Sequence, residues 1–201
     1  MNLETNVQPV VLQDKVGMRA PMLFAGVILL GFGFLYSLAG TALGRVAFPD
    51  QATGSTILEA GHVVGSSLVS QPFADARYFV SRPSAANYDP MAAAGSNQAR
   101  SNPDLRKRID AAIADVAARE GIARSEVPAD LVTQSGGGLD PHLSPAAARV
   151  QIARVARARG LSEAVVARAV ADATEGPQFG VLGQARVNVL RRNLALDASQ
   201  R

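Results

Sequence analysis

The chain contains no cysteine in its 201 residues, and its only imidazole side chains are those of His62 and His142. Without cysteine, disulfide bonds, thiolate nucleophiles and thiolate metal sites are excluded, although the absence fits a cytoplasmic and a periplasmic location equally well. Two histidines without further histidine or cysteine ligands also argue against a zinc site. We therefore predict no metal site and no thiol chemistry.

Tryptophan is absent as well, and aromatic residues make up 5% of the chain although hydrophobic residues make up 48%. A core must therefore be built mainly from Ala, Val, Leu and Ile, which favours closely packed helices and small strands. A strong excess of one charge is also missing, because the net charge is +3 and the basic residues form no single long run. This distribution argues against nucleic-acid binding.

No pattern typical of an active site is present either. Ser135, Asp140 and His142 supply the residue types of a hydrolase triad, but neither a nucleophile elbow nor another recognised spacing surrounds them. We therefore expect no catalytic residues and no enzyme activity in this chain itself.

One long uncharged segment runs from Ala20 to Gly44, between Arg19 and Arg45. As a helix it would measure about 37 Å, which is enough to cross a hydrocarbon core of about 30 Å. We predict an N-terminal segment at 1–19, a transmembrane helix at 20–46 and one soluble domain at 47–201. A cleaved signal peptide is the alternative, because Ser37-Leu38-Ala39 has the small-x-small pattern of a cleavage site.

Small residues recur along one side of this uncharged segment. Gly26, Gly33, Ser37, Gly40 and Gly44 are separated by seven, four, three and four positions, which places them on one stripe of an α-helix. Such a stripe lets a second helix approach closely in lipid, so we predict a helix-packing interface. The alternative is chance, because glycine is common in membrane helices.

The flanking charges bear on the orientation of the span. Lys15 and Arg19 precede it, whereas only Arg45 follows it closely, which favours a cytoplasmic N-terminus. We therefore expect a single-pass protein of the bacterial inner membrane, in contact with membrane lipid and carrying a periplasmic soluble domain.

The soluble part is predicted to have an α+β fold, with short strands and loops followed by a C-terminal helical part. Short β-favouring pieces occur at His62–Val64 and Tyr78–Val80 within a stretch rich in Gly, Ser and Pro. Cap and stop signals then predict helices at 103–120, 145–159 and 163–173, the last two as an antiparallel pair, and a final segment at 187–196 closes the domain.

A Gly-rich loop lies between Gln134 and Leu139. Its backbone N–H groups are candidates for holding a nucleotide phosphate, with Ser135, Gly136, Gly137, Gly138 and Asp140 as the binding residues. No Gly-Lys-Ser/Thr follows, so a P-loop is not supported. The structural alternative is a tight loop whose Asp140 and Ser144 cap the helix that follows.

Several motifs occur in one order along the soluble part: Gly65-Ser66-Ser67-Leu68 with Gln71 and Phe73, Tyr78-Phe79 with Arg82-Pro83-Ser84, Ser96-Asn97, Ser135-Gly136-Gly137-Gly138-Leu139-Asp140-Pro141-His142, Gln151 with Arg154, and Val187-Asn188-Val189-Leu190 with Asn193. In this order they closely resemble the C subunit of the Kdp potassium-transporting P-type ATPase, the KdpC family. The resemblance extends from the uncharged segment to Asp197.

The resemblance implies an accessory subunit of a high-affinity ATP-driven potassium uptake complex. Its partners would be a potassium-translocating A subunit, an ATP-hydrolysing B subunit and a small F subunit. The assembly candidates in the matched motifs are Gln71, Phe73, Tyr78, Phe79, Arg82, Ser84 and Asn97. The aromatic residues among them fit a place in the small core equally well.

Two roles follow from the resemblance. One is to stabilise assembly and support potassium access and ATP-coupled transport; the other is that of a catalytic chaperone, which raises the ATP affinity of the B subunit through a nucleotide contact at the Gly-rich loop. No cofactor would be bound tightly, and ATP is the ligand that the second role requires. Because a periplasmic domain cannot touch cytoplasmic nucleotide, the predicted topology favours the first role, with any ATP effect transmitted allosterically.

Overall fold

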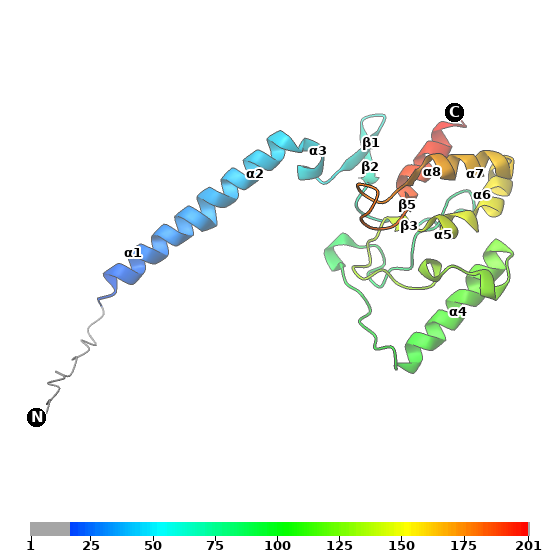
Figure 1. Cartoon of the computed structure of the whole chain (residues 1–201), viewed down its shortest axis with the longest axis horizontal. Helices are drawn as coiled ribbons and strands as arrows, with labels where there is room; N and C mark the ends of the chain where they lie inside the picture. The colour runs from blue at the N-terminus through cyan, green and yellow to red at the C-terminus, as the bar shows by residue number, and fades with distance from the viewer. Residues whose placement is uncertain (1–16, 201) are drawn as a thin grey trace, which may run out of the picture. The chain divides into compact units, whose positions relative to one another are not determined.

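The computed structural model describes residues 17–200, so the predicted cytoplasmic segment at 1–19 lies almost wholly outside the described residues. The chain divides into two compact units, Met1–Thr53 and Gly54–Arg201 (Figure 1). Within the described residues, the first unit is built from a long apolar helix and a short one, and the second from mixed helices and strands.

The first unit is a long helix from Arg19 to Ala47, followed by the short α3 (Pro49–Ala52). The long helix consists of α1 (Arg19–Ile28), a π-helical segment (Leu29–Leu35) and α2 (Tyr36–Ala47). It has a mean hydropathy of 2.1, and none of its residues is buried. By length and composition, this helix can cross a membrane.

The π-helical segment alters the spacing of the small residues. Its last turn is wide, because the N–H of Tyr36 donates to the carbonyl of Gly31 five residues earlier. The wider turns shift the helical register between Gly26 in α1 and the small residues of α2. Within α2, Ser37, Gly40 and Gly44 keep α-helical spacing.

The second unit contains two small antiparallel sheets. The first is a hairpin of β1 (Thr56–Glu59) and β2 (His62–Ser66). The second has the strand order β3–β5–β4 and is formed by β3 (His142–Leu143), β4 (Thr174–Glu175) and β5 (Arg186–Asn188). The mixed helices and sheets confirm the predicted α+β class.

The helices of this unit follow the local signals closely. The predicted helix 103–120 is confirmed as α4 (Pro103–Glu120). Asn102 caps its N-terminus, because its side chain accepts the N–H of Asp104, and Gly121, with φ +70°, ends it. The others are α5 (Pro145–Arg149), α6 (Ile152–Arg159), α7 (Glu163–Asp172) and α8 (Val189–Ala198), with short 3₁₀ turns at Pro90–Ala92, Arg124–Glu126 and Ala129–Leu131.

The single helix predicted at 145–159 is wrong in one respect, because it is interrupted between α5 and α6. The side-chain amide of Gln151 donates to the carbonyl of Ala147. In an unbroken α-helix, this carbonyl would accept the backbone N–H of Gln151. That N–H instead donates to Ala148, in a tighter turn. The interruption therefore follows from the inward position of the Gln151 side chain.

The core of the second unit is aliphatic, as the composition predicts. Ala147, Ala148 and Ala156 are almost completely buried, and α6 packs against α7 across the short connection Gly160–Ser162. The largest fully buried apolar side chains are those of Phe79, Leu143, Val155, Val166, Val187, Val189 and Leu196. Small side chains on the helices thus allow the close approach that a core with few aromatic residues needs.

Phe79 belongs to an extended segment that passes through this core. Its N–H donates to the Asn193 side-chain oxygen at 2.8 Å, and its carbonyl accepts from the Asn193 amide nitrogen at 3.0 Å. The next residue, Val80, makes the same pair of bonds with Gln151, at 2.8 and 3.2 Å. The predicted strand at Tyr78–Val80 is therefore wrong, because two side-chain amides occupy the place of a neighbouring strand.

Two arginines hold the residues just before Phe79. Arg154 donates to the carbonyls of Ala76 and Tyr78 at 2.7 and 2.9 Å, and its charge is paired with the buried Glu120 at 2.9 Å. Arg159 donates to the carbonyl of Arg77 and pairs with Asp197 at 2.8 Å. We call Gln151, Arg154, Arg159 and Asn193 the polar clamp, because together they bind the backbone of residues 76–80 to α6 and α8.

The polar clamp generates a stability prediction. Replacing Gln151 by Ala leaves the half-buried N–H and carbonyl of Val80 without their partners, and each such group costs about 1–3 kcal/mol where water cannot reach it. We expect Gln151→Ala to lower the free energy of unfolding by about 2–4 kcal/mol, measured by urea unfolding of the detergent-purified chain with circular dichroism. The control is Gln178→Ala at an exposed position, with an expected change within about 0.5 kcal/mol. Equal losses in the two variants would contradict the prediction.

Candidate functional site

The Gly-rich loop Ser135–Asp140 packs against the segment that follows Arg82. The N–H of Ser135 donates to the carbonyl of Pro83 at 3.2 Å, and the Ser84 hydroxyl donates to the carbonyl of Gly138 at 2.6 Å. The same Ser84 oxygen accepts the N–H groups of Ala86 and Tyr88. Ser84 therefore joins the two segments.

At two positions of this region the backbone lies so close to a neighbouring segment that only glycine fits. Gly138 has φ +75°, and a Cβ atom there would lie 2.8 Å from the carbonyl oxygen of Ala94. A Cβ atom on Gly95 would lie 2.5 Å from the carbonyl oxygen of Gly136. Gly136 and Gly137, in contrast, are exposed and have open space around them.

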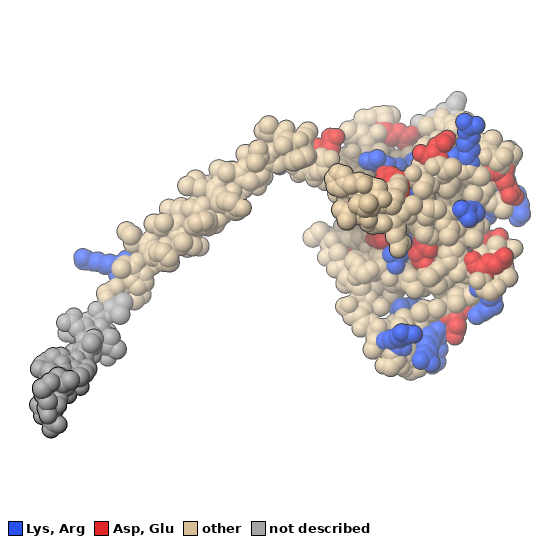
Figure 2. Space-filling view, viewed as in Figure 1, with Lys and Arg blue, Asp and Glu red and all other residues tan. Residues whose placement is uncertain are grey.

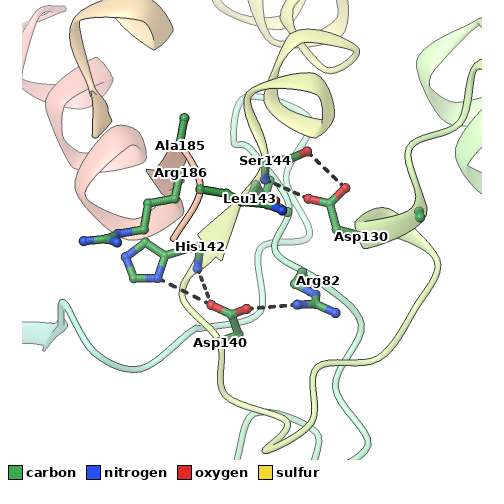
Figure 3. A pocket seen from close by; sticks show the side chains of 10 residues that line it. Arg82, Asp130, Asp140, His142, Leu143, Ser144, Ala185 and Arg186 are labelled. Carbon is green, nitrogen blue, oxygen red and sulfur yellow. Dashed lines mark hydrogen bonds and ion pairs between the residues drawn. The ribbon is translucent and has the colours of Figure 1, made fainter. Parts of the chain in front are cut away.

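Asp140 lies at the end of the loop, between the side chains of Arg82 and His142 (Figure 3). Its carboxylate accepts from the Arg82 guanidinium at 3.0 Å and lies 3.4 Å from Nδ1 of His142, while the His142 N–H donates to it at 3.0 Å. Partial burial raises the pKa of Asp140, but the hydrogen bonds from His142 and Arg82 outweigh this effect and hold the pKa below its ordinary value. Asp140 is therefore held as a carboxylate.

The predicted capping of the next helix is confirmed for Ser144 and wrong for Asp140. The Ser144 oxygen accepts the N–H of Ala147 at the start of α5. The carboxylate that supports this turn is that of Asp130, which accepts from the N–H of Ser144 at 2.7 Å and from its hydroxyl at 3.2 Å. Asp140 lies one short strand too early to reach the helix.

A pocket of about 470 Å³ opens beside Asp140 (Figure 3). Its walls come from the Arg82 segment, the turn around Asp130, strand β3 and the residues just before β5. The lining residues are Arg82, Ala129, Asp130, Asp140, His142, Leu143, Ser144, Gln184, Ala185 and Arg186. Asp130, Gln184 and Arg186 belong to no predicted site. The pairing of β3 with β5 brings Gln184 and Arg186 to the pocket, and hydrogen bonds with Ser144 bring Asp130 there.

The charges of the pocket limit what it can bind. Arg82 is paired with Asp140, and Arg186 is paired with Glu175 at 3.0 Å. Among residues 17–200, no group of three or more His, Asp or Glu side chains is placed to hold a metal ion. The nucleotide hypothesis at the Gly-rich loop stays a prediction, with the exposed backbone of Gly136 and Gly137 as its accessible part.

The predicted assembly candidates lie mostly within the domain. Phe79 is 1% exposed and lies in the core, and Phe73 packs against the core with its ring centroid 5.4 Å from that of Tyr78. The Gln71 side chain donates to the carbonyl of Val64. Asn97 is exposed, with φ +50°. Arg82 and Ser84 support the Gly-rich loop.

Tyr78 lies beside the polar clamp. Its hydroxyl donates to Asp197 at 3.0 Å, and Arg159 lies over its ring at 5.1 Å from the centroid. The hydrogen bond to Asp197 raises the pKa of Tyr78. The aromatic motif Tyr78-Phe79 thus has a structural explanation within the chain.

Two neighbouring glycines of the loop provide a matched test. In Gly138→Ala, the left-handed conformation costs about 1–2 kcal/mol, and the contact with Ala94 adds about 1–3 kcal/mol of overpacking. We expect a lower melting temperature for Gly138→Ala and an unchanged one for Gly137→Ala, measured by circular dichroism of the purified chain. A destabilised Gly137→Ala, or a Gly138→Ala as stable as the wild type, would show that the loop does not pack in this way.

Comparisons with known proteins agree with the motif order. Residues 18–198 match the family described as "KdpC: K+-transporting ATPase, c chain". A "Potassium-transporting ATPase KdpC subunit" of Xanthomonas campestris pv. campestris is 60% identical over 186 residues, which cover 92% of this chain and 89% of the relative. A protein of the same description from Shewanella putrefaciens is 50% identical and covers 90% of this chain and 89% of its own length. The chain therefore belongs to the KdpC family, the C chains of K+-transporting ATPases.

Proposed function

We propose that the chain is a non-catalytic accessory subunit that anchors itself in the membrane through Arg19–Ala47 and stabilises a potassium-transporting ATPase complex. The observation that carries this proposal is the division of the chain into an apolar helix with no buried residue and a domain whose polar motifs bind one another. The helix has no partner among the described residues, so its apolar surface is free for lipid and for other subunits.

The small residues of the helix support a role in assembly. A Cβ atom built on Gly26, Gly33, Gly40 or Gly44 would meet nothing within 4 Å, so packing within the described chain does not require glycine at these positions. In lipid, such positions allow close approach and van der Waals contact with a second helix. We infer that Gly33, Ser37, Gly40 and Gly44 contact a membrane helix of the complex.

The proposed arrangement follows the charge asymmetry around the helix. The N-terminus would be cytoplasmic and the domain periplasmic, at the inner membrane of a bacterium. There the domain would support potassium access to the A subunit, and effects on the B subunit would pass through the assembly, which also contains the F subunit. The second candidate is a catalytic chaperone that contacts ATP at the exposed Gly136-Gly137 backbone.

The packing role is tested by a double substitution in α2. Gly40→Leu with Gly44→Leu places two bulky side chains on the small-residue stripe, and we expect this variant to be lost from the complex during affinity purification in detergent. Ala42→Leu is the matched control, because Ala42 lies about half a turn away from Gly40. Normal co-purification of the double variant would argue strongly against this interface.

The two candidate roles differ in topology. We expect an alkaline phosphatase reporter fused after Arg201 to be active and a green fluorescent protein at the same point to be dark, because only the former matures outside the cytoplasm. The reverse pattern would place the domain in the cytoplasm and favour direct contact with ATP. Intact mass of the membrane-extracted chain serves as the control for cleavage near Ala39, because a cleaved chain lacks the helix.

A further inference from the structure

An apolar loop projects from the second unit between β4 and β5. Residues 176–185 contain no charged side chain, and the exposed fractions of Phe179, Val181 and Leu182 are 83%, 79% and 58%. Figure 1 shows this loop just before β5, and Figure 2, in the same view, shows an uncharged tan area there. We call residues 176–185 the apolar loop.

The backbone of the apolar loop is held in a defined shape. The N–H of Gln178 donates to the carbonyl of Leu182 at 2.8 Å, and the N–H of Leu182 donates back at 2.9 Å. The base is closed by the β4–β5 pairing and by the ion pair between Glu175 and Arg186. Phe179 has φ +55°, an uncommon conformation for a residue with a side chain. The exposure of the three apolar side chains therefore belongs to an ordered loop.

Hydrogen bonds connect the strand that follows the loop to the first residue of the second unit. The second unit starts at Gly54, whose carbonyl accepts from the Ser66 hydroxyl at 2.7 Å. The carbonyl of Ser67, the residue after Ser66, accepts from the Asn188 side chain at 2.8 Å. Because Asn188 ends β5 and the loop directly precedes β5, a short chain of contacts joins the loop to the attachment point.

The covalent link keeps the domain near the bilayer. Residues 48–53 separate the apolar helix from Gly54 and reach about 20 Å at most. A surface held at this distance meets the lipid at a high effective concentration, whether or not partner subunits are present. An uncharged loop with exposed Phe, Val and Leu side chains suits the boundary between headgroups and acyl chains.

We propose that the apolar loop inserts Phe179, Val181 and Leu182 into the interfacial region of the bilayer and so forms a second membrane contact of the domain. This inference rests on the proposed function in one respect, namely that Arg19–Ala47 crosses the membrane. Since the loop carries no charge, the contact does not depend on anionic lipid. It limits the rotation of the domain about its tether.

The absence of tryptophan from the chain allows a direct test. The variant Phe179→Trp carries the only tryptophan, and the full chain is reconstituted into phosphatidylcholine vesicles with acyl chains brominated near the headgroup. We expect the emission to fall by at least about half relative to unbrominated vesicles, because interfacial side chains lie about 5–10 Å deep. The control is Val165→Trp, at an exposed apolar position on α7, with no expected loss.

A second variant separates the loop from its surroundings. Adding Val181→Asp and Leu182→Asp to Phe179→Trp places two charges beside the reporter, and the quenching should then disappear while the chain still floats with the vesicles. Quenching that survives these charges would overturn the proposal.

The remaining outcomes are equally decisive. Flotation without quenching of Phe179→Trp overturns the loop–lipid contact and leaves the proposed function intact. Emission that is unquenched in vesicles but shifts to the blue when the complex assembles also overturns it, and assigns the loop to a partner subunit. Failure of the chain to float overturns the membrane anchor and, with it, the inference.

Discussion

The second unit depends on the hydrogen bonds that two buried side-chain amides make to one extended segment. Asn193, in α8, binds both the N–H and the carbonyl of Phe79. Gln151, at the N-terminus of α6, binds both groups of the next residue, Val80. Gln151 and Asn193 are 0% and 1% exposed, so water cannot replace either partner. The polar clamp thereby fixes Phe79 in the core and sets the course of the chain on both sides of it.

The candidate site depends on this segment, because Arg82, Pro83 and Ser84 follow it directly. Their bonds to Asp140, Ser135 and Gly138 hold the Gly-rich loop, and Asp140 in turn orders the start of β3 through the N–H of His142. Asp140, a predicted nucleotide-binding residue, thus belongs to a chain of contacts that begins in the core. Among the glycines of the loop, Gly138 serves the same packing.

The sequence predicts best those features whose physical signal is local. Asn102 and Gly121 border α4 with a side-chain cap and a left-handed residue, and both act within one turn of the helix, so its bounds are predictable. The three-stranded sheet is not, because β3, β4 and β5 have only two or three residues each and their partners are distant in the sequence. Tyr78–Val80 resembles a strand because an extended segment bound by amide side chains has the same alternation as one bound by a neighbouring strand. The apolar loop carries a visible signal, glycines around Phe179 and Val181, but its exposure depends on the fold.

The π-helical segment changes how many other helices can pack closely against the apolar helix. An unbroken α-helix with one stripe of small residues offers a single seam, so all its close contacts would fall to one adjoining helix. The wide turns at Leu29–Leu35 rotate Gly26 out of line with Ser37, Gly40 and Gly44. The two halves of the helix consequently present their small residues in different directions. Under the proposed function, each half is then free to pack against a different neighbouring helix.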